Sequence, residues 1–275
     1  MAQLYEYKTR EVLVHHSIDL QPDAAKFPMH AHEQCEIHCF LQGKGKYMVE
    51  GHEYPLEPGT LLIMRPAETH RLLIDPCQVY ERMGIHFSSD IVRAADPSGK
   101  LLEAFENRKL GESNLYLPKD FPSIGAYALL KEICNPILPE EERSTALLAY
   151  LLPLLHQIRA AFLHNSKKNA PAVHRDISLS LIEYINTHLF ENLSLEKLSG
   201  LLFLSKSQLE RIFQKATGSP ISEYIAIKRL MEARRMIQSG SRAAAVARHC
   251  GFKDYSTFFR AYKKRFGCSP ASDRQ

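Results

Sequence analysis

The sequence predicts an α+β protein, in which an antiparallel β-barrel or sandwich and its following helices precede an all-α unit. Three observations support this class. Short β-branched and aromatic runs, separated by turn signals, occupy residues 12 to about 87, a pattern typical of antiparallel strands. From about residue 123 the apolar residues recur at helical spacing instead. The last third of the 275 residues repeats one helical design twice, which indicates two related helical units.

The β region contains the apolar runs VLVHH, EIHCFL, KYMVE, TLLIM and VYERMGIHF. Successive side chains of a strand point to opposite faces, so Glu36 and His38 lie on one face and Ile37 on the other. If Glu36 points into the barrel, His38 does so too. A polar barrel mouth of this size suits a small ligand.

Two helices are predicted after the β region, over about residues 122–134 and 139–163. The longer one begins with three glutamates, which suit the positive end of a helix. Its leucines lie on more than one side and exceed what packing on one barrel needs, so we expect a homodimer to form there. Pro153 predicts a kink or a break. The longest apolar run, Ala146–Leu155, is too short for a membrane span.

The charge is unevenly distributed, although the net charge is only +4. Residues 174–275 hold 17 Lys and Arg against 9 Asp and Glu, whereas residues 1–173 hold 18 against 22. A basic last third is expected where only that third meets phosphate. The six cysteines show no CxxC spacing and no apolar leader precedes them, so we expect reduced thiols in a cytoplasmic protein.

The basic third contains two predicted helix-turn-helix units. In the second unit, a short apolar face ends at Gly251, because glycine commonly ends a helix. Asp254 stands at the N-cap of the next helix, whose inner face carries Phe258 and Tyr262. Its outer face presents Tyr255, Ser256, Thr257, Arg260, Lys263 and Lys264.

The first unit repeats this design, with Ser194 and Ser205 as the N-caps of LEKLSGLLF and KSQLERIFQKATG. The outer face of its second helix presents Lys206, Ser207, Glu210 and Arg211. Between the units, an 18-residue helix starts after Pro220 and spans about 27 Å. Adjacent major grooves lie about 34 Å apart, so the two outer faces suit double-stranded DNA.

The stretch VARHCGFKDYSTFFRAYKKRFGCSP resembles the signature of the arabinose-regulator (AraC) family of bacterial transcription factors, and the resemblance extends over about Arg175 to Arg274. Phe259 and Asp273 depart from it, since the family usually has a small polar residue at the first position and an aromatic one at the second. The resemblance implies a cytoplasmic regulator, an activator that works at promoter DNA with RNA polymerase. The residues in register with the signature are Phe258, Arg260, Lys263, Gly267 and Pro270.

A second resemblance covers about residues 26–90. The pattern His30-Ala-His32-x3-Glu36-x6-Gly43, followed by Pro58-Gly59 and Pro66-x3-His70, is similar to the two motifs of the cupin barrel. It implies that His30, His32, Glu36 and His70 can hold a divalent metal. The second motif is one residue shorter than the enzyme form and lacks its glycine, so the favoured interpretation is a metal-free rim.

This rim of polar side chains, with His38 and Arg82 nearby, suits a small hydroxyl-rich effector such as a carbohydrate. The alternative for His32 and Glu36 is that they only hydrogen-bond each other. No cofactor is needed for the rim.

We therefore expect a cupin-like sensory and dimerisation domain at residues 1–163, with the barrel at about 12–90 and helices at about 123–163. A linker at 164–173 and a double helix-turn-helix domain at 174–275 follow. No nucleophile elbow, phosphate loop or HExxH helix is present, so no catalytic residue is predicted. Two alternatives stay open: a metal-dependent cupin enzyme fused to a DNA-binding module, and a constitutive DNA-binding protein with a vestigial barrel.

Overall fold

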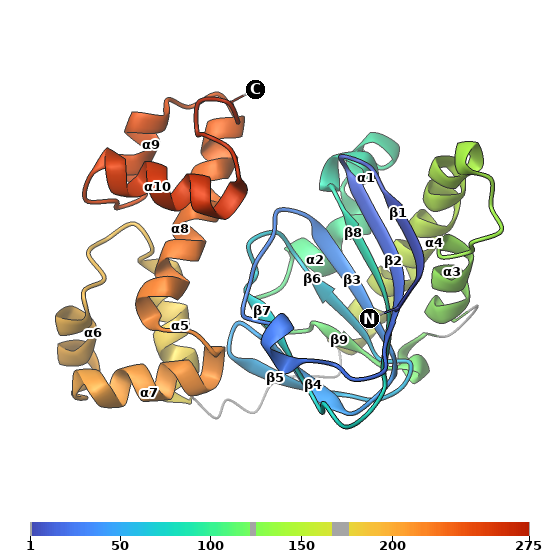
Figure 1. Ribbon diagram of the computed structural model, residues 1–275, viewed down its shortest axis with the longest axis horizontal. Helices are drawn as coiled ribbons and strands as arrows, with labels where there is room; N and C mark the ends of the chain where they lie inside the picture. Colours follow the sequence, from blue (N-terminus) through green and yellow to red (C-terminus); the bar gives the residue numbers. More distant parts are fainter. Residues whose placement is uncertain (1, 122–124, 167–175, 275) are drawn as a thin grey trace. The chain divides into compact units, whose positions relative to one another are not determined.

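The computed structural model describes residues 2–121, 125–166 and 176–274 (Figure 1). These residues form two compact units, of which the first contains the β-strands and four α-helices and the second contains six α-helices. The predicted α+β class is confirmed.

The strands of the first unit form two antiparallel sheets. The larger sheet has the order β1 (Ala2–Lys8), β2 (Val12–Asp19), β8 (Tyr80–Phe87), β3 (Cys35–Gln42), β6 (Leu61–Met64) and β9 (Leu115–Tyr116). The smaller sheet has the order β5 (His52–Leu56), β4 (Gly45–Val49) and β7 (His70–Ile74).

The predicted barrel is not closed, because no strand pair among the described residues joins the two sheets. Gly43 lies between β3 and β4, where the chain leaves the larger sheet for the smaller one. Its φ of 131° lies in the region that favours glycine. The strands are short, and the chain turns sharply where it passes from one sheet to the other. Loops rather than paired strands therefore join the two sheets.

Alternation along the strands separates two cores. Ile37, Ile63 and Ile85, from three neighbouring strands, face the helices of the unit. Because the side-chain period is two, the residues between them face the smaller sheet. This second core contains Phe40, Tyr47, Val49, Leu56, Leu62, Met64, Leu72, Ile74 and Tyr80. The expected division of β3, with Glu36 and His38 opposite Ile37, is confirmed.

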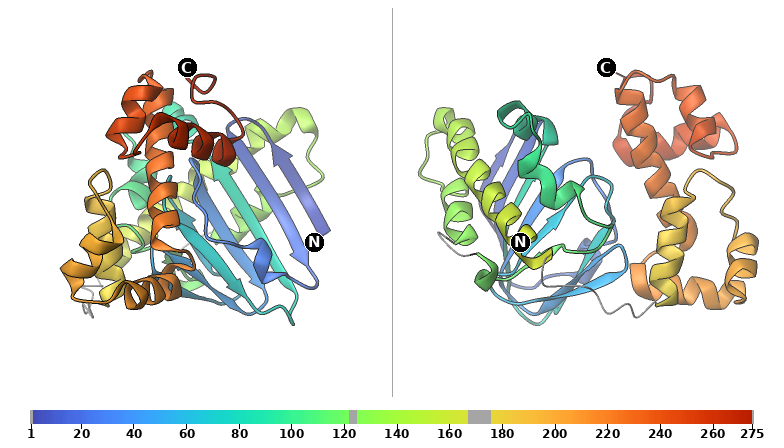
Figure 2. Two further views of the ribbon diagram at one scale, coloured as in Figure 1. Left: turned by 60° about the vertical axis from the view of Figure 1, so that its left-hand side comes forward. Right: turned by 180° about the vertical axis from the view of Figure 1, so that it is seen from behind.

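Helices α3 (Ala126–Ile133) and α4 (Glu140–Ser166) pack on the outer face of the larger sheet (Figure 2), together with the shorter α1 (Ser89–Ala95) and α2 (Glu103–Glu106). A break at Pro153 does not occur, since α4 continues through it. Leu151, Leu154 and Leu155 on both sides of the proline are fully buried and hold α4 in the core. Most of the leucine surplus therefore fills this core, whereas Leu148 is 38% exposed.

Two further points concern α4. By length and apolar composition it is the one helix in the described part of the chain that could cross a membrane, a test that core helices also pass. The predicted linker at 164–173 begins inside α4, and residues 167–173 lie outside the described residues.

The second unit is all α. Its helices are α5 (Ile177–Thr187), α6 (Leu195–Leu202), α7 (Lys206–Thr217), α8 (Ile221–Gln238), α9 (Ala243–His249) and α10 (Tyr255–Phe266). Residues of α8 enter two separate cores, one shared with α5–α7 and the other with α9 and α10. Two helix-turn-helix units on one connecting helix are therefore confirmed (Figure 1).

The helix caps predicted for the two helix-turn-helix units of the all-α unit are present. The side chain of Ser205 accepts from the backbone N–H of Gln208 in a capping box, and Asp254 accepts from Thr257 N at 2.7 Å. The turn between α6 and α7 passes through Phe203, which has a φ of 53° and is 95% exposed. The turn after α9 passes through Gly251, with a φ of 74°.

Candidate DNA interface and effector site

Helix α10 presents the predicted outer face to solvent. Phe258 and Tyr262 are fully buried against α8 and α9. The opposite face is exposed at Tyr255, Ser256, Thr257, Arg260, Lys263 and Lys264. The hydroxyl of Thr257 donates to Asp254 Oδ2 at 2.9 Å, so this group already supports the N-cap. Phe259 is half-buried, with its ring centroid 6.3 Å from that of Tyr255 on the same helix.

Helix α7 has the same arrangement, with Leu209 and Phe213 buried and Lys206, Ser207 and Arg211 exposed. Glu210 differs from the other predicted contact residues of α7. It is half-buried, and its carboxylate accepts a hydrogen bond from Ile221 N at 3.2 Å. Glu210 therefore satisfies a backbone donor in the first turn of α8, a role that the sequence did not predict.

In the first unit, Glu36 on β3 is only 4% exposed and lies among histidines. His32 Nε2 donates to Glu36 Oε2 at 2.8 Å, and His70 Nε2 lies 3.2 Å from the same oxygen. His38 Nδ1 lies 3.9 Å from Glu36 Oε1. Three of the sequence-predicted residues, His32, His38 and His70, therefore converge on the buried carboxylate of Glu36.

The electrostatics of this cluster follow from burial and contact. Burial alone would raise the pKa of Glu36, but the nearby His86 and the bonds with His32 and His70 hold this pKa well below its ordinary value. Burial lowers the pKa of His38 to about 3. Burial would also lower the pKa of His70, but its contact with Glu36 raises it above the ordinary value. At neutral pH the cluster combines an ionised carboxylate with a neutral imidazole at His38.

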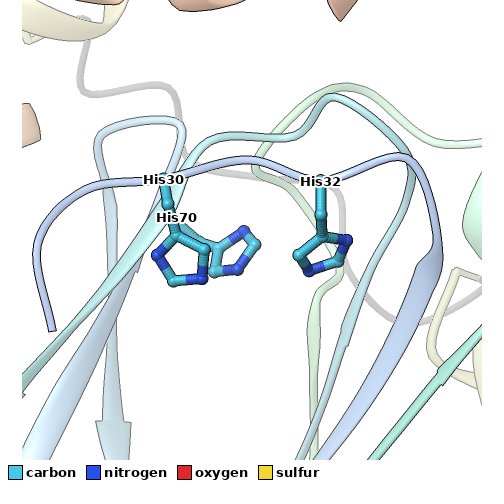
Figure 3. A group of neighbouring side chains, drawn as sticks. All are labelled: His30, His32 and His70. Atoms are coloured by element: carbon cyan, nitrogen blue, oxygen red, sulfur yellow. The ribbon is translucent and has the colours of Figure 1, made fainter. Parts of the chain in front are cut away.

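Two overlapping groups of this cluster have the donor types that metals use. The ring nitrogens of His30, His32 and His70 lie within 4.8 Å of one another (Figure 3). The ligand atoms of His32, Glu36 and His86 form a second group within the same limit. Imidazole nitrogens and carboxylate oxygens are ligands of divalent transition metals such as zinc, so the donor types of these residues fit a metal.

The orientation of two imidazoles also fits a metal. Nδ1 of His32 lies 2.8 Å from Gln34 O, and Nδ1 of His70 lies 2.8 Å from Glu68 O, which leaves both Nε2 atoms facing Glu36. The separation of 2.8 Å between His32 Nε2 and Glu36 Oε2 is nevertheless that of a hydrogen bond. Two ligands about 2.1 Å from one tetrahedral ion lie about 3.4 Å apart. The observed distance therefore matches the alternative in which His32 and Glu36 bond each other.

Arg82 on β8 is 9% exposed and connects to this cluster through an aromatic ring. Its Nη1 lies 3.2 Å from Asp19 Oδ2, and its guanidinium lies over the rings of Tyr80 and Phe27, at 4.5 and 5.5 Å from their centroids. The Tyr80 hydroxyl lies 3.4 Å from His38 Nε2. A continuous set of polar groups thus runs from Asp19 to Glu36 inside the unit.

The loop before His70 is fixed by a buried ion pair. Arg108 donates from Nη1 to Glu68 Oε1 and from Nη2 to Glu68 Oε2, both at 2.7 Å. The two side chains are 2% and 0% exposed. Since Glu68 O also contacts the His70 ring, the pair positions one wall of the Glu36 cluster.

Sequence reasoning missed His86 as a member of this cluster. The ring of His86 lies 4.8 Å from that of His32, and strand pairing sets His86 opposite Glu36. Strand alternation places His86 on the same face of β8 as Arg82, a predicted rim residue, so the sequence spacing already indicated that His86 points toward the rim. Only the pairing of β8 with β3 shows that His86 lies opposite Glu36.

Two family models match the chain. The description "AraC-like ligand binding domain" matches residues 18–155, and "Helix-turn-helix domain" matches residues 198–275. The chain is similar to the uncharacterized HTH-type transcriptional regulator YbfI of Bacillus subtilis (25% identity over 84% of this chain and 81% of that protein). It is also similar to the HTH-type transcriptional activator RhaS of Escherichia coli O157:H7 (24% identity over 94% and 96%). Among solved structures, ToxT of Vibrio cholerae O395 matches with 14% identity over 96% of this chain and 97% of that one, at a TM-score of 0.40.

Proposed function

The chain belongs to the AraC family of transcription regulators, with a ligand-binding domain and a helix-turn-helix DNA-binding domain, and from this premise we propose that it is an effector-responsive activator. It acts in the cytoplasm on promoter DNA, together with RNA polymerase. Its effector is a small metabolite, a carbohydrate for example, bound inside the first unit. The observation that carries this proposal is the set of buried polar groups around Glu36.

A buried carboxylate surrounded by imidazoles costs free energy unless its partners satisfy it. The two oxygens of the Glu36 carboxylate can accept from a pair of sugar hydroxyls, and the neutral imidazole of His38 can both donate and accept. An effector of this kind replaces the internal bonds of the cluster with bonds of its own, and in this proposal it binds one state of the protein better than another. This difference in affinity is what an effector needs in order to change DNA binding.

The DNA contacts we propose come from the exposed faces of α7 and α10. Arg211 and Arg260 are exposed, and a guanidinium can bond bidentately to guanine O6 and N7. The lysines of the two faces, Lys206, Lys263 and Lys264, suit phosphates. Since Glu210 already bonds Ile221 N, we expect Ser207 and Arg211 to carry the base contacts of α7.

A homodimer through α4 remains part of the proposal. Leu155 is fully buried in the core of its own unit and does not serve this surface. Leu148 is 38% exposed and is the leucine we assign to it. The domain limits we propose are those expected from the sequence, with sensing at 1–163 and DNA binding at 174–275.

A thermal-shift screen of sugars and other metabolites tests the effector site, because a ligand that binds the native state raises its melting temperature. We expect one class of hydroxyl-rich compounds to stabilise the wild-type chain and not the Glu36→Gln variant. Glu36→Gln should still bind selected DNA without the compound. The matched control is Glu53→Gln, on an exposed carboxylate of β5, which should respond as the wild type does.

A divalent cation is the competing occupant of the same residues. His32, Glu36 and His70, with His30 or His86, would hold it, and it would supply a Lewis-acidic position for an effector oxygen. Metal analysis of the dialysed protein separates the two cases. Stoichiometric zinc, iron or manganese that disappears in Glu36→Ala contradicts the metal-free rim and favours the alternative, a metal-dependent cupin enzyme fused to a DNA-binding module.

A further inference from the structure

Arg229 lies at the middle of α8, the helix that connects the two helix-turn-helix units. Its side chain makes three hydrogen bonds, and all of them go to main-chain carbonyls. Nε donates to Leu189 O at 2.9 Å, and Nη2 donates to Glu191 O at 2.6 Å. Nη1 donates to Gly251 O at 2.8 Å.

These acceptors belong to different halves of the domain. Leu189 and Glu191 lie between α5 and α6, in the half that contains recognition helix α7. Gly251 lies in the turn between α9 and α10, three residues before the N-cap of the other recognition helix. One guanidinium therefore ties both halves to the same point of α8.

The glycine turn is shaped around this guanidinium. A Cβ atom at Gly251 would lie 2.8 Å from Arg229 Cζ, and the φ of 74° independently favours glycine. A second contact joins the same two segments, since the rings of Phe190 and His249 have centroids 4.9 Å apart.

We propose that Arg229 is a positioning residue that fixes the separation and angle between α7 and α10, and thereby sets the spacing of the two DNA elements that the chain reads. This inference rests on the proposed binding of both helices to one duplex. Two linked binding elements gain affinity only when the linker geometry lets both engage at once. An arginine is needed because its planar fork can reach three carbonyls, whereas a lysine ammonium on a single stem cannot keep all three directions.

The test uses the full chain and needs no known operator. Selection from a random duplex library with the wild-type chain defines the two elements and their spacing. Binding is then measured on this duplex, on duplexes with one base pair added or removed between the elements, and on duplexes with a single element. The variants are Arg229→Lys and Arg229→Met, and the control is Arg235→Met, whose side chain is 71% exposed and pairs only within α8, with Glu232.

We expect the wild type and Arg235→Met to prefer the selected spacing by about tenfold or more, and both Arg229 variants to lose most of this preference. Binding to a single element should stay within about twofold of wild type. Folded Arg229 variants that keep the spacing preference would overturn the inference. Loss of helical circular dichroism in both Arg229 variants would also overturn it, because the role of Arg229 would then be stability. A wild-type chain that selects no two-element site would contradict the proposed function instead.

Discussion

The buried pair of Glu68 and Arg108 gives the sharpest stability prediction. Besides the two bonds from Arg108, the Glu68 carboxylate accepts from Gly111 N at 2.9 Å, from Arg65 N at 3.1 Å and from Asn114 Nδ2 at 3.1 Å. The change Glu68→Gln keeps the shape of the side chain, removes its charge and points an amide N–H at these donors. We expect it to leave the Arg108 guanidinium buried without its counter-ion.

The magnitude follows from the pKa of this carboxyl. Burial alone would raise it, but the hydrogen bonds and charge of Arg108 outweigh burial and lower the pKa of Glu68 from 4.5 to about 2. That difference corresponds to about 3 kcal/mol of stability, and breaking a buried pair by removing one partner costs about 3–5 kcal/mol. Because the folded-state pKa is the lower one, this contribution is present in full above pH 4.5 and disappears as the pH falls toward 2.

Urea unfolding followed by circular dichroism measures the loss. Glu68→Gln should be about 3 kcal/mol less stable than wild type at pH 7, and the two proteins should converge in acid. The control Glu53→Gln breaks a half-exposed pair with Lys46 and should cost less than about 1 kcal/mol. A folded Glu68→Gln protein within about 1 kcal/mol of wild type at pH 7, or a difference that persists at pH 2, would refute the reasoning.

Three further predictions concern DNA binding, acid stability and assembly. Arg260→Ala should weaken binding by about 1–3 kcal/mol and relax the preference at one or two base pairs in a selection assay; uniform weakening with a shallower salt slope would mean that Arg260 touches only phosphate. Asp273→Asn should lower the melting temperature at neutral pH and match wild type in strong acid. Burial alone would raise the pKa of Asp273, but bonds from Arg234 and Tyr262 lower it. The carboxylate therefore stabilises the fold at pH values above its ordinary pKa, and this contribution is lost as the pH falls through the lowered pKa. Leu148→Glu should give a folded monomer in sedimentation, and unchanged association would exclude this face of α4 as the dimer surface.

The helix-turn-helix units were readable from the sequence because their signals are local. The N-caps Ser194, Ser205 and Asp254 lie within three residues of the backbone groups that they bond. Apolar residues at helical spacing then separated the buried and exposed faces of α7 and α10. Asp273, a departure from the family pattern, is explained by the structure, since it bonds Arg234 at 2.6 Å and Tyr262 at 2.7 Å.

The parts that could not be predicted depend on distant pairing. Glu68 and Arg108 are 40 residues apart, and His86 meets Glu36 only through the register of β3 and β8. No local spacing specifies either contact. The leucines of α4 predicted a dimer surface although Leu155 is buried in the core, because helical periodicity cannot tell a helix that packs on a sheet and short helices from one that packs on a partner chain.

Helix α8 has a consequence for how the DNA-binding unit can be taken apart. Ile221, Tyr224 and Ile225 at its start complete one core, while Leu230 and Ala233 further along complete the other. Neither half retains a full interior if the chain is cut within this helix, so limited proteolysis there should yield no persistent fragment. Chimaeras that exchange one helix-turn-helix unit between relatives will need to exchange the half of α8 that packs on that unit as well. The junction between the two halves of α8 falls at Arg229.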